Sequence, residues 1–360
     1  MRRTAVIPGG MEIPAIPEPS EPPAVEPAPV VGPRIAVIIP CYKVTRSIEA
    51  VIADIGDWAW GIWCVDDCCP EGSAEVIAAL AKTNPRVHLV RRPQNGGVGA
   101  ATMSGYSAAI EAGADILVKI DGDGQMDPRL VPALVRPIIE GKADYVKANR
   151  FFSAETIASM PSLRLIGNAG LSFFSKLSSG YWDLFDPTNG FTALEARVAA
   201  VLPFDKIHPR YFFESDLLFR LGVMRARVVE LPQIAIYGDE ESSLSELDAL
   251  LTFPGLHARN FFKRIAYNYF LRGFSVASLN LLFGVLLGGF GTVFGSYHWI
   301  VAAQSGSAAT AGTVMVAALP ILVGLQLVLS FLATDISNTP REPMHPRLAD
   351  IRILGSDLHG

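Results

Sequence analysis

The sequence predicts an α/β domain with a mostly parallel sheet, followed by a C-terminal hairpin of two transmembrane helices. Two observations lead to this fold class. From residue 35 to residue 148, short apolar runs rich in β-branched residues alternate with helical segments, the pattern of a parallel α/β sheet. Between Arg272 and Asp335 the chain contains no Asp, Glu, Lys or Arg, which suits the interior of a bilayer.

The elements follow from these runs. We expect strands at residues 35–39, 62–65, 87–90, 116–120 and 145–148, and helices at residues 45–55, 71–82, 98–112 and 128–140. The α/β domain then covers residues 34–245. Residues 1–33 are rich in Pro, Glu and Ala without a periodic apolar pattern, which predicts a disordered or polyproline-like tail. No continuous apolar stretch follows Met1-Arg2-Arg3, so this tail is not a signal peptide.

The uncharged window contains two apolar spans, residues 274–295 and 313–333, each long enough to cross a bilayer. The alternative is a buried helical hairpin in a soluble core. Basic residues flank both spans but are missing from the link between them, which predicts a cytoplasmic location for the α/β domain and both termini. Residues 246–273 mix basic and aromatic side chains, as in a helix lying on the membrane surface or a plain connecting helix, and residues 335–360 form a cytoplasmic tail.

Composition excludes some classes of function. The formal net charge is −5, which argues against nucleic acid bound through a broad basic face. The 4 cysteines fit neither a disulfide framework in a chain of 360 residues nor a complete zinc site. We therefore expect reduced cytosolic thiols.

Asp121 and Asp123 follow the fourth expected strand, with Gly122 and Gly124 beside them. Residues i and i+2 of an extended strand point to the same side, so both carboxylates can reach one ligand. Such a pair suits Mg²⁺, which usually takes one or two carboxylates plus substrate phosphates. The alternative is an acidic turn between a strand and a helix.

The other strand ends are also polar, and ligands of parallel sheets bind at the carboxyl ends of the strands. The first strand ends in Pro40-Cys41-Tyr42 and the second in Asp66-Asp67. The third leads to Asn95-Gly96-Gly97-Val98-Gly99, a weak dinucleotide-binding signal because it does not follow the first strand and Thr102 replaces the third glycine.

With these strand ends in this order, the chain resembles the family 2 glycosyltransferases of the GT-A fold. Residues 186–191, Asp-Pro-Thr-Asn-Gly-Phe, make it similar to the dolichol-phosphate mannosyltransferase branch and its bacterial polyprenyl-phosphate relatives. The resemblance covers residues 34–237, and the paired C-terminal membrane helices match the bacterial members.

The resemblance implies a nucleotide-sugar site. In it, Asp66 would accept hydrogen bonds from the base or ribose, and Pro40 and Tyr42 would shape the base pocket. Asp121 and Asp123 would hold Mg²⁺ or Mn²⁺ against the donor diphosphate, with support from Gln125. Lys119 lies on the same strand face as Asp121 and is expected to form an ion pair with it.

The resemblance also implies an acceptor site. Glu214 and Asp216 match the acidic helix motif in which many inverting relatives keep a catalytic base. A polyprenyl phosphate is already an anion and needs no base, so these acids would either act directly or orient the sugar and support the fold. Arg150 matches a family arginine linked to the acceptor phosphate, and arginine suits bidentate phosphate contact. Arg164 is a weaker candidate for this phosphate contact, and we expect it to be a solvated or salt-bridged arginine on the surface.

Two departures from the family pattern concern the donor. Lys43-Val44 stands where the first-strand motif commonly has Asn-Glu, and residues 237–243 are acidic where the family often has a basic residue. How the diphosphate is covered, and which donor is used, stay open.

We therefore expect a membrane-anchored inverting glycosyltransferase that moves a sugar from a UDP- or GDP-linked donor to polyprenyl phosphate on the cytoplasmic leaflet. Alternatives are transfer to a hydroxyl of a lipid-linked saccharide or glycan, and a non-catalytic membrane scaffold. No nucleic-acid partner is expected. Small residues at 284–291 would also allow a homo-oligomer.

Overall fold

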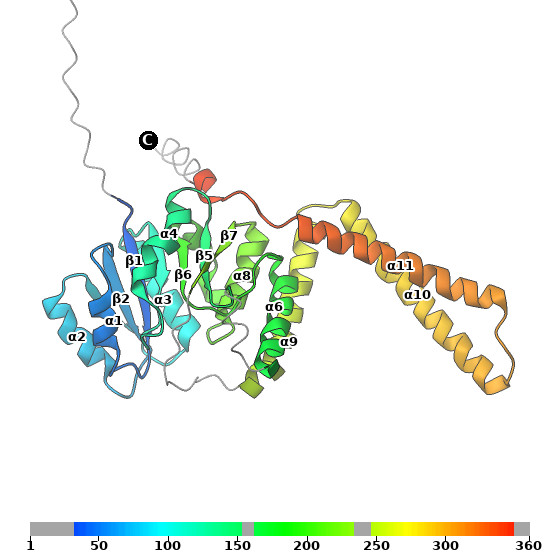
Figure 1. Ribbon diagram of the computed structural model, residues 1–360, viewed down its shortest axis with the longest axis horizontal. Coiled ribbons are helices and arrows are strands. Elements are labelled where there is room, and N and C mark those ends of the chain that lie inside the picture. Colours follow the sequence, from blue (N-terminus) through cyan, green and yellow to red (C-terminus); the bar gives the residue numbers. More distant parts are fainter. Residues whose placement is uncertain (1–31, 153–161, 234–245, 349–360) are drawn as a thin grey trace, which may run out of the picture. The chain divides into compact units, whose positions relative to one another are not determined.

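The structure is a computed structural model that describes residues 32–152, 162–233 and 246–348 (Figure 1). By contacts the chain divides into two units, Met1–Gly32 and Pro33–Gly360. The expected tail at residues 1–33 lies almost entirely outside the described residues, as do residues 237–243 and the chain beyond residue 348. Every element below belongs to the second unit.

One sheet organises the α/β domain (Figure 1), and its strands in the described ranges run in the order β3-β2-β1-β4-β6-β5-β7. They are β1 (Ile35–Cys41), β2 (Gly61–Asp66), β3 (Val87–Arg91), β4 (Ile116–Lys119), β5 (Tyr145–Asn149), β6 (Thr192–Glu195) and β7 (Val228–Pro232). Only β6 is antiparallel to its neighbours, β4 and β5. The predicted α/β class with a mostly parallel sheet is confirmed.

Helices cover both faces of this sheet. On one side lie α1 (Ile48–Asp54), α2 (Ser73–Thr83) and α4 (Val131–Ile139), which follows the short turn η1 (Pro128–Leu130). On the other lie α3 (Val98–Glu111), α7 (Ala196–Ala200) with the turn η2 (Phe204–Lys206), and α8 (Phe213–Met224).

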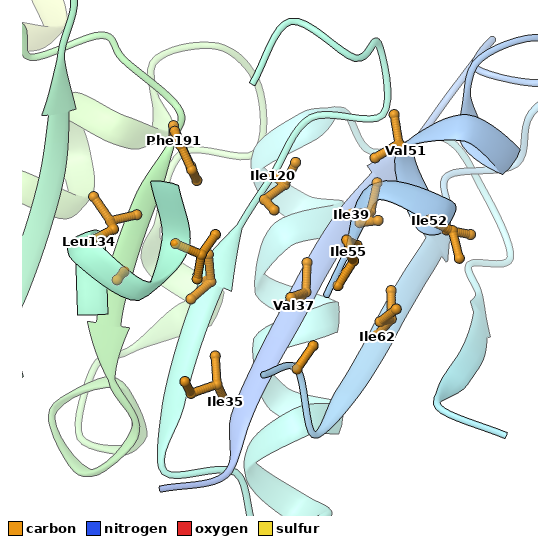
Figure 2. Close-up of a cluster of buried hydrophobic side chains, with 14 of the residues drawn as sticks. Ile35, Val37, Ile39, Val51, Ile52, Ile55, Ile62, Ile120, Leu134 and Phe191 are labelled. Carbon is orange, nitrogen blue, oxygen red and sulfur yellow. The ribbon is translucent and has the colours of Figure 1, made fainter. Parts of the chain in front are cut away.

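The alternation of β1 explains the two cores. Val37 and Ile39 point into the first cluster, beside Val51 of α1 and Leu134 of α4 (Figure 2). Ala36 and Ile38 point into the second, against α3. Because a strand with apolar residues on both faces must be covered on both, β1 lies in the middle of the domain.

A helical pair leads from the α/β domain toward the apolar hairpin. Helix α6 (Ser162–Ser179) packs against α9 (Glu246–Ile265), and the two lie side by side in Figure 1. Helix α9 continues into η3 (Ala266–Leu271), so the expected segment at residues 246–273 is helical over most of its length.

The apolar hairpin consists of α10 (Val276–Ser305) and α11 (Ala311–Ser337). Both helices are long and apolar enough to cross a membrane, with mean hydropathies of 1.8 and 2.3, and most of their surface is exposed. They are candidate membrane spans. Helix α10 begins two residues after the expected span 274–295 and ends ten residues later, and α11 is longer at both ends than the expected 313–333. Gly284 and Gly291 of α10 pack against the backbone of α11, so these small residues serve the contact within the hairpin.

The chain contacts the α/β domain on both sides of the hairpin. Before α10, Nη1 of Arg272 donates to the carbonyl oxygen of Val223 in α8 at 2.6 Å. Asp335 near the end of α11 accepts hydrogen bonds from Trp182 and Arg264. After α11 the chain returns to the sheet, where the main-chain N–H groups of Met344 and His345 donate to the buried carboxylate of Asp144, just before β5. The hairpin therefore leaves and re-enters the same domain.

Candidate active site

Polar residues gather at one edge of the sheet because β1, β2 and β4 are parallel. In the register of these strands, Cys41 of β1 lies beside Asp66 of β2. Ile38, three residues before Cys41, lies beside Lys119 at the end of β4. The segments that follow these strands, which carry Tyr42 and Asp121, therefore start from the same edge.

Asp66 has an incomplete set of hydrogen bonds. Its side chain is buried at the end of β2, and its Oδ1 atom has no hydrogen-bond partner among the described residues. Burial raises the pKa of this carboxyl group, while the main-chain N–H groups of Cys69 and Cys68 lower it. A buried acceptor without a partner is costly, so the position suits a ligand that donates a hydrogen bond.

Asp67, the next residue, has a structural role. Its carboxylate accepts hydrogen bonds from the main-chain N–H groups of Gly96 at 3.0 Å and Gly97 at 2.7 Å. Gly97 has φ +92°, a conformation that favours glycine. The glycine cluster after β3 is thus held on Asp67, which explains it without a dinucleotide.

The first-strand loop is joined to the loop after β2. The main-chain N–H of Lys43, at φ +59°, donates to Sγ of Cys69 at 3.1 Å. Tyr42 is 45% exposed beside this contact, and Pro40 is half-buried within β1. All four cysteines are free thiols, as expected.

Asp121 and Asp123 lie in the turn after β4. Nζ of Lys119 is 2.7 Å from Oδ1 of Asp121, the predicted ion pair. Oδ1 of Asp123 accepts a hydrogen bond from the main-chain N–H of Gln125 at 3.0 Å, so the contact between Gln125 and Asp123 uses the backbone. Gly124, at φ +82°, allows the tight turn between them.

Glu214, at the start of α8, joins this group. Its Oε1 atom is 3.8 Å from Nζ of Lys119, and burial raises its pKa to about 7. A second buried lysine, Lys147 of β5, donates to the carbonyl oxygen of Asn189 at 2.6 Å, and burial lowers its pKa to about 8. Two lysines and two carboxylates thus form a compact, nearly neutral cluster.

Gly190 makes this cluster possible. A Cβ atom at this position would collide with Nζ of Lys119 and lie 3.2 Å from Oδ2 of Asp121 and 3.4 Å from Oε1 of Glu214. The loop that contains Gly190 therefore approaches the charged side chains closely, which requires a residue without a side chain.

Asp216 has other partners although it lies only two residues from Glu214. It accepts hydrogen bonds from the main-chain N–H of His208 at 3.0 Å and from Nδ2 of Asn260 at 2.9 Å, and it pairs with Arg220. These contacts join α8 to α9. The structure therefore brings Glu214, but not Asp216, into the cluster with Asp121.

Arg150 follows β5 and lies against Asp186. Its Nε and Nη2 atoms are 2.9 and 3.0 Å from the two carboxylate oxygens, a bidentate contact. Asp186 is buried, and the main-chain N–H groups of Phe185 and Asp186 both donate to Oε1 of Glu230. The side chain of Arg164 lies outside the described part of the structure.

Sequence reasoning missed Lys147, Asn189 and Glu230. Lys147 carried a signal, since a lysine between Val146 and Ala148 in a central strand must be buried or paired. Asn189 belongs to the motif at residues 186–191, which did not reveal its role, and Glu230 carried no signal. The partners of both come from elements more than 40 residues away.

The side chains at the strand ends can be compared with the ligands that different metal ions require. In the described ranges no group of three or more His, Cys, Asp or Glu side chains could hold a metal ion. The pair Asp121 and Asp123 offers only oxygen ligands, which suits a hard divalent cation that takes its other ligands from water and a substrate diphosphate. A closed structural zinc site does not fit.

Known proteins are similar to this chain over the α/β domain. Residues 36–202 match the family model for glycosyl transferase family 2. An undecaprenyl-phosphate mannosyltransferase of Micrococcus luteus is 28% identical over 55% of this chain and 82% of its own length. A UDP-N-acetylglucosamine–dolichyl-phosphate N-acetylglucosaminyltransferase of Methanococcus voltae is 30% identical over 56% of this chain and 86% of its own length.

Among solved structures, a complex of glucosyl-3-phosphoglycerate synthase from Mycobacterium tuberculosis with Mn²⁺ and UDP is 23% identical, with a TM-score of 0.46 over 65% of this chain and 80% of that chain. The sequence matches are the stronger finding, and the family match includes Lys119, Asp121 and Lys147 of the cluster but ends before Glu214. The chain therefore belongs to glycosyl transferase family 2.

Proposed function

We propose that this nucleotide-sugar-dependent glycosyltransferase transfers a sugar, with inversion, to polyprenyl phosphate on the cytoplasmic leaflet. The observation that carries the proposal is that the domain with the strand-end site contacts the chain on both sides of an apolar hairpin, through Arg272 before α10 and through Met344 after α11. The names of the two relatives above, one bacterial and one archaeal, both contain a polyprenyl phosphate acceptor. They differ in the sugar, so the sugar of this chain is left open.

The donor would bind across the strand ends. The unpartnered Oδ1 of Asp66 would accept a hydrogen bond from the base or ribose, with Pro40 and Tyr42 beside it. Asp121 and Asp123 would hold Mg²⁺ or Mn²⁺, which would neutralise the diphosphate as it leaves. Lys119, buried and 2.7 Å from Asp121, holds this carboxylate in its orientation.

A phosphate acceptor changes what the acidic helix has to do. Because the attacking oxygen already carries negative charge, no proton must be removed from it. Glu214 would then balance the charges of Lys119 and Lys147 and orient the sugar. Asp216 would hold α8 against α9 through Asn260.

The topology follows from the contacts of the hairpin. Arg272 before α10 donates to the carbonyl oxygen of Val223 in α8, and His345 after α11 donates to Asp144. If both segments stay on the domain, the hairpin crosses the bilayer an even number of times. Basic residues on both flanks would place this side in the cytoplasm.

The acceptor is tested with membranes that contain the protein, labelled UDP- or GDP-sugars and Mg²⁺ or Mn²⁺. We expect a chloroform-soluble product that mild acid releases. A product that is only a water-soluble glycoside or a polysaccharide would contradict the acceptor. Asp123→Asn should abolish metal-dependent turnover in a folded protein. Asp127→Asn removes the same charge four residues later, where Asp127 pairs with Arg129, and should retain turnover.

One observation favours the alternative, transfer to a hydroxyl. A buried carboxyl group with its pKa near 7, as at Glu214, is suited to general-base catalysis. If Glu214 is a base, Glu214→Gln removes the rise of kcat between pH 5 and pH 8. If the acceptor is a phosphate, the variant lowers kcat but retains the shape of the profile.

A further inference from the structure

We propose that Lys176 of α6 is a second cation for the acceptor phosphate, acting beside Arg150 on a surface of aromatic side chains that receives the polyprenyl chain. This inference rests on the proposed function and names a residue that recognises the acceptor. Lys176 is separated from Arg150 by 26 positions in the sequence, so only the fold brings them to one surface.

A chain of ring contacts connects the two cations. Cζ of Arg150 is 5.5 Å from the ring centroid of Phe151, whose ring is 5.8 Å from that of Phe185. Nζ of Lys176 is 5.9 Å from the ring centroid of Phe185. The guanidinium and the ammonium group thus flank the same pair of rings.

The local charges suggest that binding of the acceptor phosphate needs a cation in addition to Arg150. Arg150 forms a bidentate pair with Asp186, so the two side chains together are close to neutral. Lys176 forms no ion pair with any residue in the described ranges, and its ammonium group lies over the Phe185 ring. Lys176 therefore adds net positive charge beside the Arg150–Asp186 pair for an arriving phosphate anion.

The geometry of Arg150 is set by its supports. Asp186 takes two of the five N–H donors of the guanidinium and fixes its plane. Asp186 is held in turn by Glu230, which also accepts from Nδ2 of Asn149 at 2.7 Å. Arg150 is thus a rigid, oriented donor, whereas Lys176 is a flexible point charge that can follow the phosphate.

The surface around the cations is apolar. Phe152 is 68% exposed beside Phe151, and Phe185 is 37% exposed. On α6, Phe173 and Phe174 are 52% and 40% exposed, with Phe173 one helical turn before Lys176. Helix α6 packs on α9, and the ring of Phe174 stacks on that of His257 in α9, the helix that leads through η3 to α10. Exposed aromatic rings beside two cations fit a lipid with an anionic phosphate head.

The test measures acceptor and donor kinetics separately. The full-length protein in phosphatidylcholine nanodiscs is assayed with a short-chain polyprenyl phosphate and its nucleotide sugar. Lys176→Gln should raise the acceptor KM by about tenfold to a hundredfold, the loss of one hydrogen bond to a charged group. The donor KM and kcat should stay within about twofold. Lys176→Arg should restore most of the affinity because it retains the positive charge.

A matched control separates specific binding from general attraction to lipid. Lys263→Gln removes the same charge from an exposed position on α9 and should leave the acceptor KM unchanged. An equal rise of the acceptor KM in both variants would overturn the proposal, as would an unchanged KM in Lys176→Gln. If the wild-type protein forms no polyprenyl-phosphate product, the proposed function fails instead.

Discussion

Asp335→Asn is expected to loosen the attachment of the second apolar helix to the catalytic domain. The Asp335 carboxylate accepts from Nη1 and Nη2 of Arg264 at 2.7 and 2.9 Å, from the hydroxyl of Tyr269 at 2.7 Å and from Nε1 of Trp182 at 2.9 Å. Three separate segments, α9, η3 and the loop after α6, thus meet at one side chain.

The magnitude follows from burial. The side chains of Arg264 and Asp335 are each 3% exposed, so asparagine would leave a buried guanidinium without its counter-charge. Removing one partner of a buried ion pair lowers the free energy of unfolding by about 3–5 kcal/mol. In a domain of this size, that loss lowers Tm by roughly 6–20 °C.

The assay is thermal unfolding of the purified protein in detergent, with Asp205→Asn as the control because Asp205 is exposed on η2. The double variant Arg264→Met, Asp335→Leu should regain most of the lost stability, since it leaves no buried charge. The reasoning would be refuted if Asp335→Asn unfolded within about 2 °C of the wild type, or if the double variant were the least stable protein.

Three further predictions concern other parts of the chain. Burial lowers the pKa of His257 from 6.5 to about 4, so the unfolded state takes up the proton first as the pH falls below 6.5. The free energy of unfolding should therefore drop by about 2 kcal/mol between pH 7.5 and pH 5, and denaturant titrations of His257→Gln should show a smaller drop. Gly190→Ala should displace Lys119 and lower kcat/KM by up to about a hundredfold without unfolding; wild-type activity would contradict the tight packing. Gly291→Leu should lower Tm through a cost of about 1–3 kcal/mol because Ile321 lies against this glycine. A side chain at Gly289 would meet open space, so Gly289→Leu should leave Tm unchanged. Equal losses of Tm in the two variants would argue against the packing of the hairpin.

Much of the fold could be predicted because its signals are local. The five expected strands all occur, with ends that differ by at most two residues, since each is a short apolar run bounded by polar residues. The expected helix at residues 45–55 begins three residues later, at Ile48. Strands β6 and β7 were missed. The four residues of β6, Thr192–Glu195, become a strand by pairing between β4 and β5, and β7 (Val228–Pro232) by pairing with β5.

The sequence by itself determined the class of the domain, the apolar hairpin and the polar strand ends that carry Asp66, Asp121 and Asp123, because alternation and apolar length are properties of neighbouring residues. It could not separate Glu214 from Asp216, which lie two positions apart in one acidic motif. Residues two apart on a helix point in different directions, so the tertiary structure alone decided that Glu214 faces Lys119 while Asp216 faces Asn260. The same holds for Lys176 and Arg150, which flank the ring pair of Phe151 and Phe185 only after α6 packs on α8 and α9.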